Sequence, residues 1–419
     1  MASPRVSLIL GAAVFAYFVT VVERSSMGIA SLAAASRFET GAAALSTLAA
    51  AQLAVYAAMQ IPAGMALDRF GARALIVFGS IATGLGNFIV AFAPEIPLAV
   101  TGRMIVGFGD AFVFISMIRL INGWVVGPKA TRYTQLFANL GQLGQVFSAI
   151  PFAFLLEVAG WTPAFSLASA LAFIAAAIAM AAIRDEPQGT QPSSSWSQVL
   201  RQFRENISDP FTRKAFWVHF TLQSSGSVFI LLWGYTFLVE AENLSKAFAS
   251  LLLSSFVLVG FVVGPAISFV CVRFPNNRNR LVAFVFTLIA SAWILVSLTP
   301  GVNPTWQIVF LVLSVGIGGP ASMAAFDYSR TSIPKYRQGS SNGIINSGGF
   351  VATFISIYLI GVALDAIDVA GLVPDGKLYS LEAFKLAFPI QLLIMTIGLV
   401  MFYRERTLTQ KIREYAATE

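Results

Sequence analysis

The stretch Gly64-Met-Ala-Leu-Asp-Arg-Phe-Gly-Ala-Arg73 stands where two long apolar runs meet, one over 44–66 and the other over 74–93. Asp68, Arg69 and Arg73 are the charged residues of this turn. A helix needs about 20 mostly apolar residues to cross a bilayer, and both runs reach that length. The stretch therefore predicts two membrane-crossing helices joined by a tight, charged turn.

The same pattern continues in both directions along the chain. We expect twelve membrane-spanning helices near 7–34, 44–66, 74–93, 97–125, 133–157, 162–183, 215–239, 246–270, 281–299, 306–328, 339–364 and 383–403. The apolar run that follows Arg5 continues past Glu23 and Arg24, so it predicts a first span and not a signal peptide. The fold class expected is an all-α membrane protein.

Composition agrees with a membrane protein. Hydrophobic residues make up 57% of the 419 residues and charged residues 11%, against roughly 25% charged residues in a soluble domain. This excludes a soluble enzyme, a nucleic-acid binder and a disordered chain. The single cysteine, Cys271, excludes a disulfide scaffold, and no Cys/His cluster has the spacing of metal ligands. A phosphate-binding Gly-x-x-x-x-Gly-Lys loop is also absent from the sequence, so we expect neither direct ATP drive nor a cofactor.

Lysine and arginine residues are concentrated on alternate loops. If the N-terminus is cytoplasmic, all but seven of the 27 fall on the cytoplasmic side. The exceptions are Arg37, Lys246, Lys377 and Lys385 outside, and Arg24, Arg103 and Arg119 within spans. The positive-inside rule then predicts that both termini are cytoplasmic. The same asymmetry accounts for the net charge of +7 without a nucleic-acid partner.

A polar linker divides the chain into two similar halves. We expect a six-helix bundle over 1–183, a cytoplasmic linker over 184–214, a second six-helix bundle over 215–404 and a cytoplasmic tail over 405–419. Gly64 and Arg73 have counterparts in Gly264 and Arg273. Such weak internal symmetry is typical of secondary transporters that are built from repeats.

These residues resemble a known family. The stretch 64–73 is similar to the signature between helices two and three of the major facilitator superfamily: a glycine, three residues, an aspartate, a basic residue, then glycine and arginine. Arg103, Gly107 and Gly109 resemble the second motif of that family, and Gly160-Trp161 with Phe165 resembles its usual opening of helix six. The resemblance implies two bundles that rock about a central cavity, so that the cavity opens to one side at a time.

Two departures from the family bear on the substrate. Drug–proton antiporters typically carry Gly-Pro-x-x-Gly-Gly in helix five, whereas this chain has Asn139-Leu-Gly-Gln-Leu-Gly-Gln145 there. Nitrate carriers place an arginine in the middle of helices two and eight, and neither span has one here. The segment Glu23-Arg24-Ser25-Ser26 is instead more similar to members that carry organic anions.

Charged residues within the spans are candidate functional sites, because each costs about 3 kcal/mol or more at membrane depth. Arg103, Gly107 and Asp110 share one face of the fourth span, since seven residues make nearly two helical turns. We expect Glu23, Asp110 and Arg103 to carry proton coupling, with Glu23 as the carboxylate that takes up the proton and pairs with Arg103 when deprotonated. The alternative is a static ion pair that joins the first and fourth spans.

Arg24 is the candidate for binding the charged group of the substrate, because its guanidinium can bind a carboxylate or phosphate with two hydrogen bonds. The three arginines within spans outnumber Glu23 and Asp110, which leaves a positive charge for an anionic substrate. Other candidate substrate-binding residues are Gln52, Tyr56, Asn139, Gln142, Gln223, Trp233, Asn342 and Asn346. The alternative for these is hydrogen bonding and packing between helices.

The charged turns are candidate gates. By resemblance to the family, Gly64, Asp68, Arg69, Gly71 and Arg73 form a latch on the cytoplasmic side, and Asp327 and Arg330 are its counterpart in the second half. The alternative is plain surface charge.

The expectation is therefore a secondary active transporter of the plasma membrane that works by alternating access. The first candidate is a proton-coupled carrier of a small organic anion that acts as a monomer. The second is proton-driven efflux of drugs or amphipathic compounds, and a sensor that kept the fold without transport is a third.

Overall fold

The computed structural model describes residues 4–125, 129–185, 196–274, 277–373 and 377–418. Every regular element of these residues is helical, and their bounds are α1 Pro4–Ile29, α2 Ser31–Phe38, α3 Ala42–Phe92, α4 Ile96–Trp124, α5 Lys129–Phe147, η1 Ser148–Phe152, α6 Ala153–Ala159, α7 Trp161–Ala182, α8 Trp196–Ser208, α9 Pro210–Val228, η2 Phe229–Trp233, α10 Gly234–Thr236, η3 Phe237–Ala241, α11 Lys246–Arg273, α12 Arg278–Leu298, α13 Thr305–Ser322, α14 Ala324–Ser332, α15 Lys335–Val369, α16 Leu381–Ala387 and α17 Pro389–Thr418.

Twelve helical stretches of the described residues are long and apolar enough to cross a membrane, as the sequence predicts. The second and third spans are both part of α3, which kinks at Gly71. Gly71 has φ 79° and ψ 167°, a conformation that only glycine adopts readily. The signature turn therefore bends because of the glycine in its middle.

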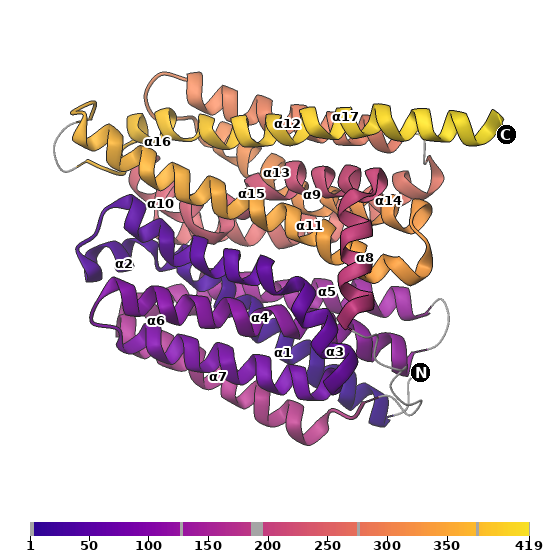
Figure 1. Ribbon diagram of the computed structural model, residues 1–419. Helices are drawn as coiled ribbons and strands as arrows, with labels where there is room; N and C mark the ends of the chain where they lie inside the picture. Colours follow the sequence, from indigo (N-terminus) through magenta and orange to yellow (C-terminus); the bar gives the residue numbers. More distant parts are fainter. Residues whose placement is uncertain (1–3, 126–128, 186–195, 275–276, 374–376, 419) are drawn as a thin grey trace.

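The two halves of the chain lie one above the other (Figure 1). The boundary between them is made by the first, second and fifth spans on one side and the seventh, eighth and eleventh on the other. α1 begins and α17 ends at the same end of the bundle (Figure 1), which we call the terminus end; the other is the far end. An even number of spans requires this arrangement.

The helices on the outside of the bundle expose large apolar side chains. Examples are Ile174 on α7, Phe284 on α12 and Val400 on α17. α9 and η2, by contrast, are almost entirely buried. Exposed apolar columns beside buried helices are what a bundle surrounded by lipid requires.

Helix α8 lies within the predicted linker. It runs across the terminus end, at a steep angle to the spans (Figure 1). The buried amide of Asn206 donates to the carbonyl oxygen of Arg337 at 3.1 Å, and the Arg337 guanidinium lies 3.6 Å from Asp209. The linker helix is therefore attached to the start of α15.

Several boundaries differ from the expectation. The seventh span begins at Pro210, because Asp209 caps the helix by accepting hydrogen bonds from the backbone of Phe211 and Thr212. The last span is broken before Pro389, and α17 continues as helix through the predicted tail to Thr418. Hydrophobic content marks the membrane-embedded length, whereas capping and polar helical turns set where a helix ends.

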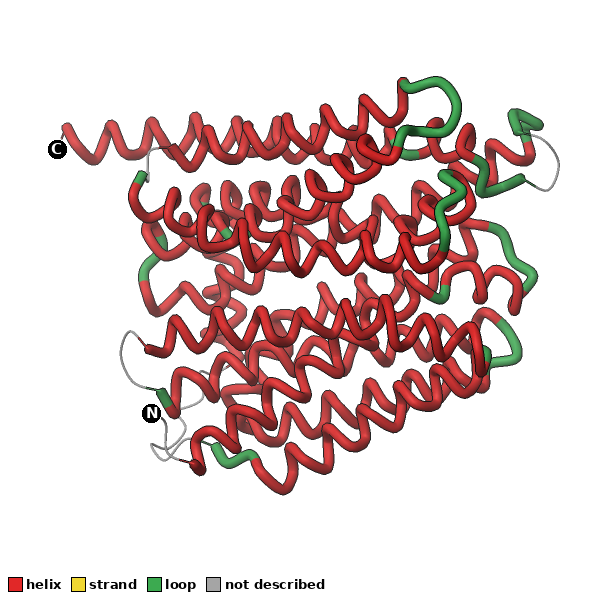
Figure 2. The backbone as a smooth tube through the Cα atoms, turned by 180° about the vertical axis from the view of Figure 1, so that it is seen from behind, coloured by secondary structure: helices red, strands yellow, loops and turns green. Residues whose placement is uncertain are grey.

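The fifth and seventh spans also contain π turns: η1, which includes Pro151, in the fifth and the pair η2 and η3 in the seventh. Elsewhere the described spans are mostly regular helices, joined at both ends by short loops (Figure 2). A π turn holds one residue more than an α-helical turn, and nothing in the hydrophobic pattern indicated it.

Candidate functional site

Arg24 and Asp110 form a buried ion pair between α1 and α4. Nε and Nη2 of Arg24 each donate to a carboxylate oxygen of Asp110, both at 2.6 Å. The Asp110 side chain is 1% exposed and that of Arg24 is 12% exposed. Both carboxylate oxygens are therefore occupied, while the guanidinium keeps a partly open edge. No hydrogen bond donated by Nη1 is found among the described residues.

Arg103 lies nearly two turns before Asp110 on α4 and contacts the same part of α1. Its guanidinium donates to the carbonyl oxygens of Glu23 and Arg24, at 3.2 and 3.3 Å, and to the side-chain oxygen of Gln52. Gly107 lies against the backbone of Gln52, which lets α3 approach α4 closely. Arg103, Gly107 and Asp110 thus share one face, as their spacing predicts.

Glu23 is fully buried within the first half. Its carboxylate lies near Thr83, Asn87 and Arg103, but neither oxygen has a hydrogen-bond partner among the described residues. The expected direct ion pair between Glu23 and Arg103 is not formed in this structure, because Arg103 donates to the Glu23 carbonyl instead. The acid that pairs with an arginine here is Asp110.

Aromatic rings connect this charge cluster to the second half. The Arg24 guanidinium lies 4.8 Å from the ring centre of Tyr56 and 5.8 Å from that of Phe350 on α15. One turn along, Asn346 of α15 donates to Gln60 of α3 at 3.1 Å. The charge cluster, which we define as Glu23, Arg24, Arg103 and Asp110, therefore borders the contact between the second and eleventh spans.

Gln142, another predicted binding residue, lies beside the first span. Gln142 donates to the Tyr17 hydroxyl at 3.0 Å, and Gly141 packs directly on the Tyr17 ring. Asn139 is half-buried on the same helix. The fifth span is thus brought against the side of α1 that carries Tyr17.

Apart from Asn346, the hydrogen bonds found for the candidates of the second half stay within that half. Gln223 donates to Ser227 and accepts from Ser322. Trp233 is fully buried and donates its indole N–H to the carbonyl oxygen of Ile357. The side-chain oxygen of Asn342 is buried without a hydrogen-bond partner among the described residues. None of the hydrogen bonds of Gln223 or Trp233 is to the charge cluster.

The predicted gate at the terminus end is held from within the first half. Asp185, which the sequence analysis did not single out, accepts from the backbone N–H of Arg73 at 3.0 Å. The Arg73 guanidinium donates to the carbonyl oxygen of Met180 at 2.7 Å. Arg73 therefore binds the end of α7 and Asp185 just after it. The side chain of Asp68 lies outside the described residues.

Other residues of the predicted gates are placed at the same end. Arg69 is exposed, with its guanidinium over the Phe70 ring. A Cβ on Gly64 would meet nothing within 4 Å, and the same holds for its counterpart Gly264. In the second half the carbonyl oxygen of Asp327 accepts from Thr331 at 2.8 Å. The side chain of Arg330 lies outside the described residues.

The far end carries a contact between the halves that sequence reasoning missed. The carboxylate of Asp365, near the end of α15, accepts from the backbone N–H groups of Ala42 and Ala43 at 2.6 and 2.9 Å. These N–H groups belong to the first two residues of the second span. The start of a helix has free N–H donors and favours negative charge. An aspartate at the end of a predicted span, opposite a span that starts without a capping side chain, is the only signal the sequence offers.

Further bonds join the halves at this end. Ser31 and Thr236 share a hydrogen bond of 2.8 Å, and Lys246 lies 3.1 Å from Glu157. Among the described residues, every hydrogen bond between the two bundles lies at the far end or at the level of Gln60. The hydrogen bonds found between the halves are therefore concentrated at the far end, which is the closed one in this structure.

Comparison with known proteins gives the family. The model of the Major Facilitator Superfamily matches residues 13–357, which is most of the chain. The chain belongs to the major facilitator superfamily. A structure that it resembles is a bacterial homologue of the human lysosomal transporter Spinster in an inward-facing, unoccupied conformation, with a TM-score of 0.74 and 16% identity over 98% of this chain and 99% of that one.

Two named relatives of this superfamily member are bacterial. It is 23% identical to the probable galactarate/D-glucarate transporter GarP of Escherichia coli K12, over 82% of this chain and 84% of the relative. It is 27% identical to the probable sulfoacetate transporter SauU of Cupriavidus necator, over 39% of this chain and 38% of the relative. The superfamily and these relatives are transporters and not enzymes, and the twelve spans make this member a multi-pass membrane protein.

Proposed function

We propose that this protein carries small organic anions across the plasma membrane, driven by protons, by alternating access. The observation that supports this most directly is the charge cluster beside the boundary of the two bundles. The relatives add support, since galactarate, D-glucarate and sulfoacetate, the substrates in their names, are all small organic anions. We further propose that the protein acts as a monomer with both termini in the cytoplasm.

Arg24 is proposed to bind the anionic group of the substrate. It is the cluster member with a partly exposed side chain, and Asp110 occupies only its Nε and Nη2 edge. The remaining edge can donate two hydrogen bonds to a carboxylate or sulfonate. Tyr56 and Phe350 lie beside the guanidinium and limit the space around it to a small ligand.

Glu23 is proposed to carry the coupled proton. The two arginines stay charged throughout, and both oxygens of Asp110 are bound by Arg24. The carboxylate of Glu23 has no such partner. Taking up a proton there leaves the charge cluster with one uncompensated positive charge, and an anionic substrate neutralises it. Proton and anion then cross together, because the anion neutralises the positive charge that protonation of Glu23 leaves in the cluster.

Alternating access is proposed to work by opening the far end while the terminus end closes. Opening the far end requires loss of the contacts of Asp365, Ser31 and Lys246 with their partners. Closing the terminus end brings the open region beside Gly64 against the second half. The cluster would then face the opposite side of the membrane.

The test is a ligand screen followed by transport. Galactarate, D-glucarate and sulfoacetate are compared with phosphate esters and with the lipophilic cation tetraphenylphosphonium in a thermal-stability assay at pH 5.5 and pH 7.5. A ligand that binds only the folded state raises its apparent stability. Uptake of the stabilising anion by proteoliposomes is then measured with and without an inward proton gradient.

We expect an anion to stabilise the protein, and Arg24→Gln to abolish both stabilisation and uptake. Arg24→Lys should weaken binding by roughly tenfold, since a lysine keeps the charge but not the two-pronged geometry. Arg404→Gln, an exposed arginine of α17, serves as the matched control and should leave uptake unchanged. Stabilisation by tetraphenylphosphonium alone would contradict the proposal and favour efflux of amphipathic compounds.

A further inference from the structure

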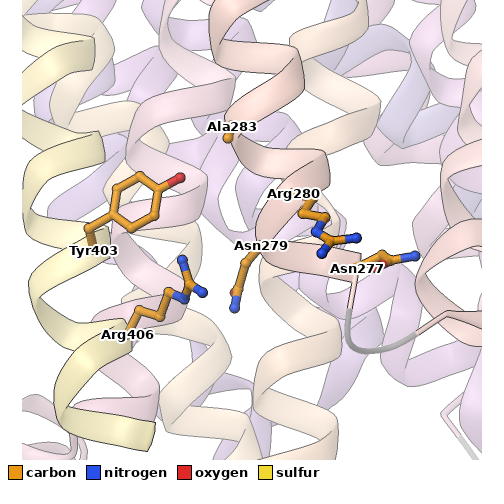
Figure 3. Close-up of a pocket in the computed structure, with 6 residues that line it drawn as sticks. All are labelled: Asn277, Asn279, Arg280, Ala283, Tyr403 and Arg406. Atoms are coloured by element: carbon orange, nitrogen blue, oxygen red, sulfur yellow. The ribbon is translucent and has the colours of Figure 1, made fainter.

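A polar cavity lies at the terminus end of the second half, between α12 and α17. Its volume is about 340 Å³. The lining residues come from the beginning of α12 and from the last part of α17 (Figure 3), and they are Asn277, Asn279, Arg280, Ala283, Tyr403 and Arg406. We call this the α12–α17 cavity. It contains no residue of the charge cluster, so the proposed transport function does not use it.

The side chains of the cavity offer hydrogen-bond donors and no carboxylate. Arg280 lines it from α12 and Arg406 from α17 (Figure 3). No ion pair of either arginine is found among the described residues, and the buried Nε of Arg406 has no hydrogen-bond partner there. The neighbouring acid, Glu405, is occupied by Arg213 at 2.9 Å. Two arginines that face one cavity without an acid between them favour an anion in it.

The remaining lining groups point to the same ligand chemistry. The side-chain oxygen of Asn279 accepts a hydrogen bond from Tyr328 at 2.7 Å, which leaves its amide N–H groups for another partner. Asn277 precedes the first turn of α12 without capping it by its side chain, and that turn contains no acidic residue. The backbone N–H groups of a helix start add a positive potential to that of the arginines. A phosphate group, with several acceptor oxygens, matches this donor set.

The position of the α12–α17 cavity indicates where such a phosphate comes from. Arg280 lies at the start of the ninth span and Arg406 near the end of the twelfth, the level at which lipid headgroups lie. Directly toward the membrane interior, Phe284 of α12 is 64% exposed and Val400 of α17 is 60% exposed. A phospholipid matches both the basic cavity and the apolar surface beside it, since its phosphate can bind the arginines and its acyl chains can cover Phe284 and Val400.

We propose that the α12–α17 cavity binds the phosphate of an anionic phospholipid from the leaflet on the side of the chain termini. Basic pockets between membrane helices are a known way of recognising such headgroups. The bound phosphate joins Arg280 of α12 to Arg406 of α17 and so removes the repulsion between them. The lipid stabilises the outer side of the second bundle, and it does so without entering the transport pathway.

The experiment titrates the full-length protein, purified in a non-ionic detergent, with short-chain phosphatidylglycerol while its melting temperature is recorded. Phosphatidylcholine and diacylglycerol are the controls for headgroup charge and for acyl chains, and inorganic phosphate is a separate arm. The variants are Arg280→Gln and Arg406→Gln. Arg404→Gln, which removes the same charge from the same helix outside the cavity, is the matched control.

Phosphatidylglycerol should raise the melting temperature of the unchanged protein more than phosphatidylcholine or diacylglycerol does. Each cavity variant should weaken its apparent affinity about tenfold, the effect of one charge-assisted hydrogen bond. Arg280→Lys should restore part of the affinity, which separates lost binding from a lost fold. Arg404→Gln should leave the affinity unchanged.

Two results would overturn the proposal. If Arg404→Gln weakens phosphatidylglycerol binding as much as Arg280→Gln, the effect is general surface charge and the cavity has no special role. If inorganic phosphate stabilises the protein through Arg280 and Arg406 while phosphatidylglycerol does not, the cavity takes a soluble anion and not a lipid.

Discussion

Arg24 and Glu23 are neighbours on one helix with separate surroundings. Adjacent residues of an α-helix point about 100° apart. Arg24 therefore turns to Asp110, Tyr56 and the second half, while Glu23 turns into the first bundle toward Thr83 and Asn87. This separation lets one residue meet the substrate while the other holds the proton.

Glu23→Gln gives the residue-scale prediction for coupling. Glutamine keeps the shape of a protonated glutamate but cannot release a proton. Uptake by the variant should lose its dependence on an inward proton gradient, and exchange of substrate across the membrane should persist. The measurement is uptake into proteoliposomes with the interior at pH 7.5 and the exterior at pH 5.5 or 7.5, with Glu39→Gln, an exposed acid, as control. Uptake in Glu23→Gln that still responds fully to the gradient would assign the proton to another group.

The sequence predicts part of this arrangement and not the rest. The common face of Arg103 and Asp110 follows from their spacing on one helix, and the structure has it. The partner of Arg24 depends on how α1 and α4 are rotated against each other, which spacing within a helix does not determine. Sequence reasoning therefore named all four members of the charge cluster but paired Arg103 with the side chain of Glu23 instead of its carbonyl oxygen.

The turn within α3 gives a prediction at the scale of elements. Gly71 has a positive φ, and a Cβ there would lie 2.9 Å from the carboxylate of Asp185. Gly71→Ala should destabilise the protein by about 1–3 kcal/mol, the usual cost of this backbone conformation for a residue other than glycine. Its melting temperature should fall, while that of Gly64→Ala, where a Cβ meets nothing within 4 Å, should not. Equal melting temperatures for both variants would show that the kink does not depend on Gly71.

Asp365 gives a second prediction at this scale. Asp365→Ala removes the acceptor for two N–H groups at the start of the second span, so the closed state of the far end loses two charge-assisted hydrogen bonds. The far end should open more often, and a cysteine introduced at Ser46 should react faster with a membrane-impermeant thiol reagent. Asp368→Ala, three residues further and exposed, is the matched control. An unchanged labelling rate in Asp365→Ala would mean that the remaining contacts keep the far end closed.

Asp185 and Asp365 share the reason why they were overlooked. Each lies at the end of a span, where the sequence alone describes it as an ordinary surface charge. Their partners are backbone N–H groups more than a hundred residues away. Such contacts depend on the packing of whole helices, and residue types give no sign of a backbone donor.

At the scale of the whole molecule, the number and approximate position of the spans follow from hydrophobic length. The bilayer requires about 20 apolar residues per helix whatever the substrate, so this part of the fold is the most readily predicted. The orientation is a further prediction from charge. A reporter that is active only in the cytoplasm should be active when fused at either terminus, and silent in the loop at 300–303 between the ninth and tenth spans. Activity in that loop and silence at the termini would reverse the orientation.

The π turns of the seventh span have a consequence for the angular phase of its side chains. Each π turn carries one residue beyond the α-helical pattern, so it advances the phase of everything that follows by about 100°. η2 and η3 are separated only by Gly234–Thr236, so relaxing one of them to α geometry would rotate the remainder of the span against α1 without tilting it. This buried span can therefore present a different row of side chains by twisting in place, in addition to any rocking of the bundles.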